Sequence, residues 1–282
     1  MTANLRRTRA TTLASIAFAL VAAPGGAPPL AAGIASAHRT VLANGAEILV
    51  IPQPGVPLVA VVSIVRSGAS SEAQGENGIS HMLEHLLFNG TEIRTQEQLY
   101  DDLDRRGIVN NAHTGLDEMT LFMLGPAAET AEMLGTESEM LFRSNFPEEK
   151  LEKERGIVLN EIAKDATQEA TRFQEALDAA LYAGTPCALP VTGTDAGIRA
   201  LGRAAIVSYH RRHYRPDNLT VLVMGDVPAG DALERARAAF GGIAKAPETP
   251  AGDPPQCRPS AGAMGQLRSL RMAGGARRIA LA

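Results

Sequence analysis

The apolar residues of this chain recur with two different periods, which predict an alternation of strands and helices. Residues 46–52 and 57–66 are rich in Val, Ile and Leu and are bounded by Gly and Pro, as expected for two strands. Residues 108–114 and 118–124 flank the turn Gly115-Leu116-Asp117 and predict a hairpin, and residues 218–224 predict a further strand. A helical period marks the segments 78–88, 95–106, 126–142, 147–182, 203–214 and 229–240.

Together these segments predict an α+β fold, in which helices pack on one face of a mixed or antiparallel sheet. The chain has 282 residues, of which 45% are hydrophobic. This length and composition suffice for one large domain or two ordinary ones, and they exclude intrinsic disorder of the whole chain. We expect a single folded domain between His38 and Glu248, with ends of a different character on either side.

The first 37 residues have the composition of a secretory signal peptide. Arginines at positions 6, 7 and 9 precede an apolar run from Leu13 to Ala23, small residues follow as far as Ala37, and no acidic residue occurs. The run is about half the roughly 20 residues that a spanning helix needs, so no stable membrane span is expected. A mitochondrial presequence would share the arginines but would be amphipathic. We expect export to the periplasm or the extracellular space, with cleavage after Ala23 or after Ala37.

The last residues, 249–282, differ in composition from the predicted domain. They are rich in Pro, Gly, Ala and Arg, and no apolar period runs through them before the last few residues, so we expect a linker or a disordered extension. Cys257 lies here and Cys187 lies in a predicted loop, and whether the two pair is left open. Neither cysteine has a partner at metal-ligand spacing, so any metal must be bound by His and carboxylate side chains.

Charge and aromatic content disfavour polyanionic partners. The chain has 27 Lys and Arg against 31 Asp and Glu, which gives a formal net charge of −4, and only 4% of its residues are aromatic, none of them Trp. Proteins that hold nucleic acids use a basic field and flat aromatic surfaces, and the composition provides neither. We therefore expect no nucleic-acid partner.

A candidate metal site lies on the predicted helix 78–88. One face carries the buried stripe Ile79, Met82, Leu83, Leu86 and Leu87. His81, Glu84 and His85 lie on the other face. Two imidazoles four residues apart on a helix can reach one ion from the same side, and Glu84 is placed to take a proton from a water on that ion. Two surface histidines beside a carboxylate would give the same pattern, but the flanking Leu86-Leu87-Phe88 indicates an enclosed face.

The predicted helix that begins near Pro147 offers a third ligand. Glu148 and Glu149 suit the first turn of a helix, where acids face the positive end of the dipole. Glu154 and Glu161 are seven residues apart and so share one face about two turns along. Two carboxylates on one face repel each other unless a cation lies near them. The alternative is a solvated helix whose acids pair with the lysines at 150, 153 or 164.

The order His81-Met82-Leu83-Glu84-His85, followed by Glu154 and Glu161, resembles the insulinase/pitrilysin/mitochondrial-processing-peptidase family of zinc metallopeptidases, the inverzincins. Glu161 follows His85 by 76 positions, and the coincidence of these spacings is more specific than any one of them. Further segments that match the family are 42–45, 78–80, 88–91, 111–114, 193–194, 214–219 and 225–226. The resemblance covers residues 40 to 245, the extent of one N-terminal domain of the family.

The resemblance implies a role for each matching residue. His81, His85 and Glu161 would bind Zn²⁺, Glu84 would be the general base, and Glu154 would hold a ligand or polarise the metal. Asn111 and Ala112 would lie on an edge strand, to which an extended peptide substrate adds as another strand. The small and polar side chains of residues 110–114 independently suit such an edge. The implied activity is that of a zinc-dependent endopeptidase.

The chain departs from the family pattern after residue 248. Family members have a second half of similar fold, which closes over the first and contributes an Arg and a Tyr to substrate and oxyanion binding. Residues 249–282 are too few to form such a half. We therefore expect a truncated chain, or one that depends on a second family-type subunit or on a homo-oligomer for turnover. The alternative is a non-catalytic subunit that binds peptide on its edge strand, or an inactive truncated family member.

Overall fold

The computed structural model describes residues 37–245, 257–259, 267–271 and 277–281. The signal peptide expected over residues 1–37 thus lies almost entirely outside the described residues. The strands are β1 (His38–Val41), β2 (Glu47–Pro52), β3 (Leu58–Val65), β4 (Val109–Thr114), β5 (Met119–Pro126), β6 (Leu219–Gly225), β7 (Leu267–Arg271) and β8 (Arg277–Leu281). The α-helices are α2 (Ile79–Leu87), α3 (Gln96–Arg105), α4 (Thr130–Arg143), α5 (Glu148–Asp165), α6 (Glu169–Leu181), α7 (Asp195–Ala200), α8 (Arg203–His213) and α9 (Ala229–Phe240). Short 3₁₀ helices are η1 (Ala69–Ser71), η2 (Ala127–Glu129), η3 (Pro186–Ala188) and η4 (Pro216–Asn218).

A six-stranded mixed sheet forms the base of the domain, in the order β1-β2-β6-β3-β5-β4. Strands β2 and β6 pair in parallel, with Val50 opposite Val223, and the other neighbours pair antiparallel. Strand β6 comes from the end of the domain and lies between β2 and β3, so residues far apart in the sequence close one sheet. The predicted α+β class with a mixed sheet is confirmed.

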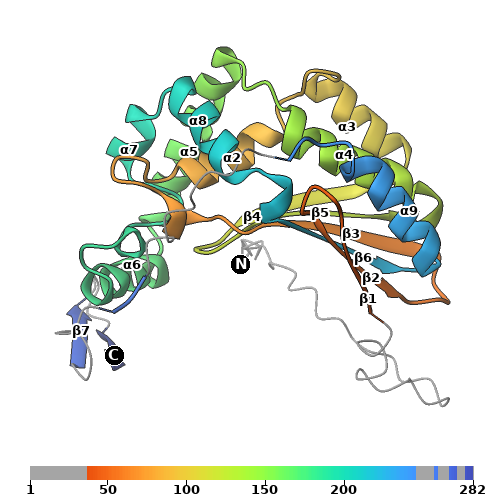
Figure 1. The fold of residues 1–282 in the computed structure, drawn as a ribbon. Coiled ribbons are helices and arrows are strands. Elements are labelled where there is room, and N and C mark those ends of the chain that lie inside the picture. The colour runs from red at the N-terminus through yellow and green to blue at the C-terminus, as the bar shows by residue number, and fades with distance from the viewer. Residues whose placement is uncertain (1–36, 246–256, 260–266, 272–276, 282) are drawn as a thin grey trace, which may run out of the picture.

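The helices cover one face of this sheet, as Figure 1 shows. The alternation of β3 explains the layering: Val59, Val61, Ser63 and Val65 are buried, whereas the residues between them are more exposed. Helix α4 packs on β3 and β5, and α9 packs on β2. Helix α2 lies close to β4, the strand at one edge of the sheet. The candidate metal helix is therefore held beside the strand predicted to receive a peptide.

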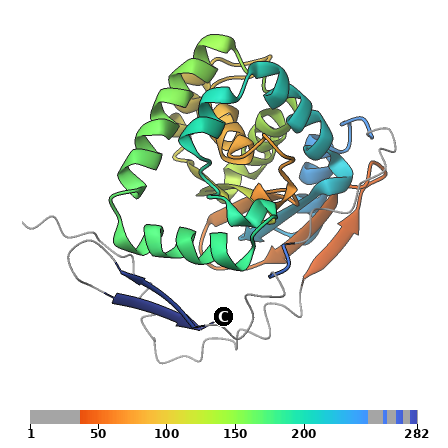
Figure 2. The same ribbon diagram turned by 90° about the vertical axis from the view of Figure 1, so that its left-hand side faces the viewer.

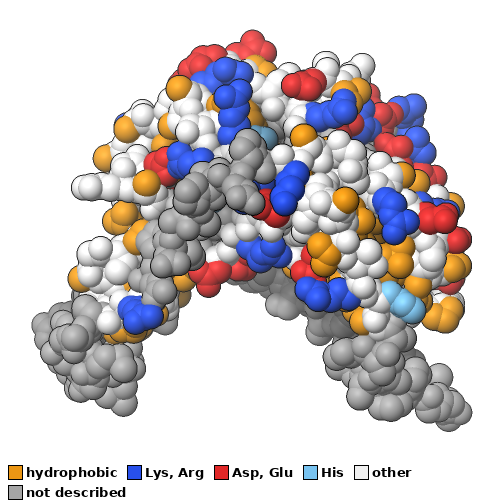
Figure 3. All heavy atoms as spheres, viewed as in Figure 1, with side chains coloured by type: hydrophobic (Ala, Val, Ile, Leu, Met, Phe, Trp, Pro, Cys, Tyr) orange, Lys and Arg blue, Asp and Glu red, His pale blue; other side chains and the backbone are white. Residues whose placement is uncertain are grey.

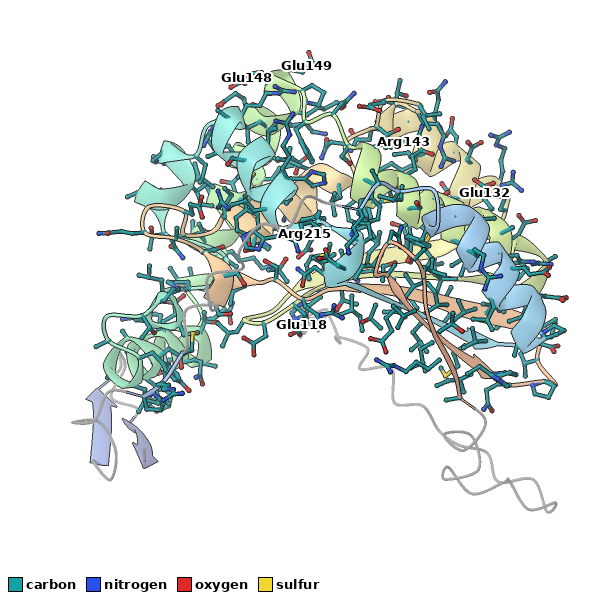
Figure 4. The ribbon with its side chains drawn as sticks, viewed as in Figure 1. Glu118, Glu132, Arg143, Glu148, Glu149 and Arg215 are labelled. Atoms are coloured by element: carbon teal, nitrogen blue, oxygen red, sulfur yellow. A yellow bond between two sulfur atoms is a disulfide. The ribbon has the colours of Figure 1, made fainter. Side chains whose placement is uncertain are left out.

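The sequence predicts one helix over 147–182, but the structure divides this segment into α5 and α6. The break falls at residues 166–168, where Gln168 adopts an extended backbone with φ −84° and ψ 122°. Helix α5 buries three side chains, whereas α6 has no fully buried residue, so the two apolar stripes are not one continuous face. Glu148 and Glu149, the predicted first-turn acids, lie at the exposed start of α5 (Figure 4).

Most of the tail, for which a linker or a disordered extension is expected, lies outside the described residues. Its described residues include an antiparallel pair of strands, β7 and β8, with Ser269 opposite Ile279, which form a separate two-stranded sheet. The pair lies beside α6 (Figure 2). Cys187 and Cys257 form a disulfide, which joins η3 to the tail.

Charged side chains on the face drawn in Figure 3 are interspersed rather than sorted by sign. The ion pairs of the domain are local, such as Arg94 with Glu139 at 2.6 Å and Arg212 with Glu76 at 2.6 Å. Among the described residues, no helix has both the length and the apolar composition that crossing a membrane requires.

Glu137 on α4 is a carboxyl group enclosed in the core. It is 0% exposed, accepts a hydrogen bond from the hydroxyl of Ser63 at 2.6 Å, and its Oε1 has no partner among the described residues. Burial raises the pKa of Glu137 to about 8, and the bond from Ser63 opposes this only in part. The folded chain therefore holds this proton over a pH range in which the unfolded chain has lost it.

Replacing Glu137 with Gln is expected to change the pH dependence of stability. In the wild type, this group contributes stability that is complete below its unfolded pKa and is lost as pH rises through its folded pKa of about 8. Gln has no proton to lose, so the variant should gain on the order of 1 to 3 kcal/mol relative to the wild type between pH 5 and pH 8. Urea unfolding of both proteins at the two pH values measures the difference. Equal free-energy differences at both pH values would show that Glu137 does not titrate in the core.

Candidate metal centre

Helix α2 carries the two candidate histidines and is fixed at its first turn. The buried carboxyl group of Glu72 accepts hydrogen bonds from the backbone N–H of Gly78 at 2.9 Å and of Ser80 at 3.0 Å, groups that lack partners within the helix. Burial raises the pKa of Glu72 to about 7, against the effect of these bonds. Gly78 has a φ of 86°, and a Cβ there would lie 2.7 Å from the Cα of Gly193. These contacts set the position from which His81 reaches out.

His81, His85 and Glu161 come together between α2 and α5. Oε2 of Glu161 lies 3.5 Å from Nε2 of His85 and 3.9 Å from Nε2 of His81. One candidate ligand atom from each residue lies within 4.8 Å of the others, and ligand atoms around a tetrahedral zinc ion are about 3.3 Å apart. The three predicted ligands therefore fit a divalent cation with small side-chain movements.

Glu154 orients the ring of His85. Its side chain is 7% exposed, Oε2 lies 3.2 Å from Nδ1 of His85, and Oε1 accepts a hydrogen bond from Nδ2 of Asn89 at 3.0 Å. Burial alone would raise the pKa of Glu154, but these hydrogen bonds and the charge of His85 outweigh it and lower the pKa. The ionised carboxylate can only accept, so Nδ1 of His85 is the donor, and Nε2 is left for Glu161 or a metal.

The two imidazoles lie in different electrostatic environments. Burial, with smaller contributions from His85 and His113, lowers the pKa of His81 to about 4. Burial acts in the same direction on His85, but the hydrogen bond to Glu154 and the charge of Glu161 outweigh it and raise the pKa. A metal ligand must be a neutral imidazole. His81 therefore has a free lone pair at neutral pH, whereas the raised pKa of His85 means that a proton competes more strongly with a metal for its Nε2.

Glu84 is half-buried on the face of α2 that carries the histidines. Its Oε2 accepts a hydrogen bond from the hydroxyl of Thr114, at the end of β4. Burial raises the pKa of Glu84, and the hydrogen bond from Thr114 opposes part of that rise. A carboxyl group with a raised pKa exchanges protons near neutral pH more effectively than an ordinary one. Oε1 is the oxygen that Thr114 leaves free.

Helix α5 is held in position by an arginine on the face next to that of its two glutamates. Arg155 donates to the backbone carbonyls of Ile198, at the end of α7, and of Leu201, the latter at 2.7 Å. Leu151 and Val158 on the same helix are completely buried. Because these contacts fix the rotation of α5 about its axis, Glu154 and Glu161 both face α2.

Asn111 and Ala112 lie on β4, which is the edge of the six-stranded sheet. The N–H of Ala112 donates to Oδ1 of Asn111 at 2.9 Å rather than to the neighbouring strand. This N–H group therefore points away from the sheet, toward the open edge of β4. Oδ1 of Asn111 accepts its hydrogen bond, as the carbonyl of an added strand would.

Sequence comparison identifies the family. The profile described as insulinase, peptidase family M16, matches residues 48–195, just over half of the chain. The chain belongs to the M16 family. A second M16 profile, that of the inactive domain, matches residues 200–264. Strand β6 belongs to this second segment but lies between β2 and β3 of the first, so the two M16 segments share one sheet.

Individual relatives match over a similar range. An uncharacterized zinc protease from Rickettsia felis is 30% identical over 203 residues, which cover 72% of this chain and 49% of the relative. The mitochondrial-processing peptidase subunit beta from Neurospora crassa is 27% identical over 216 residues, which cover 74% and 45%. The chain thus spans about half the length of these M16 relatives.

Solved structures share the fold. A protease from Helicobacter pylori has a TM-score of 0.75 at 24% identity, covering 79% of this chain and 54% of that one. The periplasmic protease PqqL from Escherichia coli has a TM-score of 0.73 at 21% identity, covering 81% and 26%. Both likenesses confirm the predicted architecture of this M16 chain.

The structure adds residues to the candidate site that sequence reasoning gave no role. Thr114 contacts Glu84, and Asn89 contacts both Glu154 and the backbone carbonyl of His85. Asn89 follows His85 by four residues, a helical spacing that could have indicated the second contact. The contact of Thr114 depends on the packing of β4 against α2, which leaves no local signal.

Proposed function

We propose that this chain is the metal-binding half of a zinc-dependent endopeptidase that hydrolyses extended or unfolded peptides. The observation that carries the proposal is the convergence of His81, His85 and Glu161, with Glu84 on the same helix face. Two imidazoles and one carboxylate are a donor set that zinc hydrolases use. The M16 relatives named as zinc proteases support the choice of metal.

The residues of the site divide the chemistry among them. A zinc ion held by His81, His85 and Glu161 would lower the pKa of a water and polarise the scissile carbonyl. Glu84 accepts the proton of the attacking water on Oε1 and returns it to the leaving amine. Glu154 keeps Nδ1 of His85 protonated and so holds the ring in the tautomer that binds metal.

The substrate peptide is proposed to bind along β4. An extended peptide that pairs with the outer side of this strand places its backbone parallel to the sheet edge, and its carbonyl replaces Oδ1 of Asn111 at the N–H of Ala112. Strand β4 ends at Thr114, which contacts Glu84. A peptide bound in this way therefore passes close to the catalytic carboxyl group. Such binding uses hydrogen bonds to the peptide backbone, so it favours unfolded segments, whose backbone groups are free to pair.

Turnover is proposed to require a second family-type half, from a separate subunit or from another copy of this chain. The basis is that the chain spans about half the length of its M16 relatives. We also propose that the protein acts outside the cytoplasm, in the periplasm or the extracellular space. The arginines and the apolar run before residue 24 support export, and a periplasmic protease is among the proteins with this fold.

Metal analysis combined with a cleavage assay tests the proposal. The purified full chain is expected to hold about one zinc ion, and to cleave a quenched-fluorescent unstructured peptide in a way that a chelator abolishes and added zinc restores. Zinc binding without zinc-dependent cleavage, by the chain alone or with its second half, would favour the alternative of a peptide-binding subunit. A chain that binds neither zinc nor peptide would contradict both functions.

A further inference from the structure

A cleft of about 490 Å³ opens beside the candidate metal centre. Its inner end is formed by Glu84, His85 and Glu154, and its walls are formed by helix α3 on one side and the first half of β4 on the other. A side chain of a peptide on β4 can enter this cleft next to the reacting bond. The residues of the walls therefore decide which side chain fits there.

Helix α3 presents three polar residues to the cleft at a spacing of four. Gln96, Tyr100 and Asp104 line it, whereas Leu99 and Leu103 on the other side of the helix are buried in the protein. Residues four apart lie one above the other on a helix, so these three form a single row. Tyr100 is 41% exposed although it is large and aromatic. The row thus consists of an aromatic face with a carboxylate one turn away.

The cleft combines apolar walls with an excess of negative charge. Phe88, Ile108 and Val109 provide apolar surface, and Val109 is 58% exposed. Glu84, Glu154 and Asp104 line the cleft, whereas none of its lining residues is Lys or Arg. With Glu161 nearby, these carboxylates outnumber the two positive charges of a zinc ion. The cleft is therefore negative even with its metal bound.

Asp104 is available to a ligand. It is exposed and forms no ion pair with another described residue, because Arg105 pairs with Asp102 and Arg106 pairs with Glu129. Lys150, behind Gln96, is likewise engaged, since its Nζ donates to Gln96 at 2.9 Å. Asn89 in the cleft wall is 4% exposed, and its Oδ1 has no hydrogen-bond partner among the described residues. The cleft therefore offers unpaired acceptors, and none of its lining residues is a cationic donor.

We propose that this cleft is a specificity subsite for a lysine or arginine next to the scissile bond, with Asp104 as its specificity-determining residue. The inference rests on the proposed function and names its substrate class. The aliphatic stem of such a side chain packs on Phe88, Tyr100 and Val109, and its cationic head reaches Asp104. The ring of Tyr100 adds a cation–π attraction. A purely apolar side chain would cover Asp104 without giving it a partner, and an acidic one would be repelled.

Binding measurements on a catalytically silent chain test this subsite. The full-length, zinc-loaded Glu84→Gln protein is titrated with fluorescent unstructured peptides that differ only in carrying Lys, Leu or Glu at one position, which is scanned along the peptide. We expect one position at which Lys binds roughly three- to tenfold more tightly than Leu, and more tightly still than Glu. The preference should shrink in high salt, because the pair is partly solvated.

Two substitutions on α3 identify the residue responsible. Adding Asp104→Asn should remove the preference for Lys, and Asp104→Lys should reverse it in favour of Glu. The matched control is Asp101→Asn, which removes an exposed acid from the same helix that does not line the cleft, and it should leave the preference unchanged.

The outcomes separate this proposal from the proposed function. A Lys preference that depends on Asp104 supports the subsite, even if the wild type shows no Glu84-dependent cleavage and the peptidase assignment fails. Binding without discrimination, discrimination that survives Asp104→Asn, or no binding of any peptide overturns the subsite. Cleavage that depends on Glu84 can persist in the first two of those cases, whereas the third would also count against the proposed function.

Discussion

Replacing Glu84 with Gln is expected to lower kcat for peptide cleavage by about 10²- to 10⁴-fold while zinc content stays unchanged. Gln has nearly the same shape and can still accept the hydrogen bond from Thr114, but it cannot take up a proton. Glu84 is not among the three groups that converge as metal ligands, so the metal should remain. Steady-state cleavage of a quenched-fluorescent peptide and metal analysis of the same preparation measure the two quantities.

The control for this substitution is Glu148→Gln. Glu148 is an exposed acid at the start of α5, thirteen residues before Glu161, and its loss should leave both kcat and zinc content unchanged. A Glu84→Gln protein that cleaves peptide as fast as the wild type would contradict the proposed general base. A variant that loses its zinc would instead show that Glu84 acts on the metal.

Elements that bury a regular apolar stripe were predictable from the sequence. Helix α2 spans residues 79–87 where 78–88 was expected, and β3 spans 58–65 where 57–66 was expected. Strand β1 has no such stripe. Its sequence His-Arg-Thr-Val is mostly exposed, and the strand exists because its backbone pairs with β2. Helix α7 buries only Ile198, too little for a period to be visible.

The candidate site also has a part that the sequence predicts and a part that it does not. The placement of His81, Glu84 and His85 on one face is a local property of a helix, so the spacing alone predicts it. The meeting of α2 with α5 is tertiary. The shared helix face offered Glu154 and Glu161 as candidates, and only the family resemblance selected Glu161 as the ligand. The disulfide between Cys187 and Cys257 joins residues 70 positions apart. The row formed by Gln96, Tyr100 and Asp104 on α3 faces β4 across the cleft. Neither contact can be predicted from a local sequence pattern.

Substitutions at the metal centre are expected to rank its residues by their distance from the ion. His85→Ala and Glu161→Gln each remove one of three ligands and should weaken zinc binding by about 10²- to 10⁴-fold, one ligand's share of a total of roughly 10 to 16 kcal/mol. Glu154→Gln leaves the ligands in place. Its amide oxygen can still accept from Nδ1 of His85, but its charge is gone, so we expect a smaller loss of about 10- to 100-fold. Competition against a chromophoric zinc chelator measures all three affinities.

The ranking depends on the contact between Glu154 and His85, which orients one ligand without touching the metal. Glu154 is buried, so thermal unfolding of each variant must show that the fold persists, and Glu148→Gln provides the unperturbed reference on the same helix. If Glu154→Gln weakened zinc binding as much as Glu161→Gln, Glu154 would itself be a ligand. If Glu161→Gln had no effect, the carboxylate that completes the centre would lie elsewhere, because Glu161 is the third residue that the fold brings to both imidazoles.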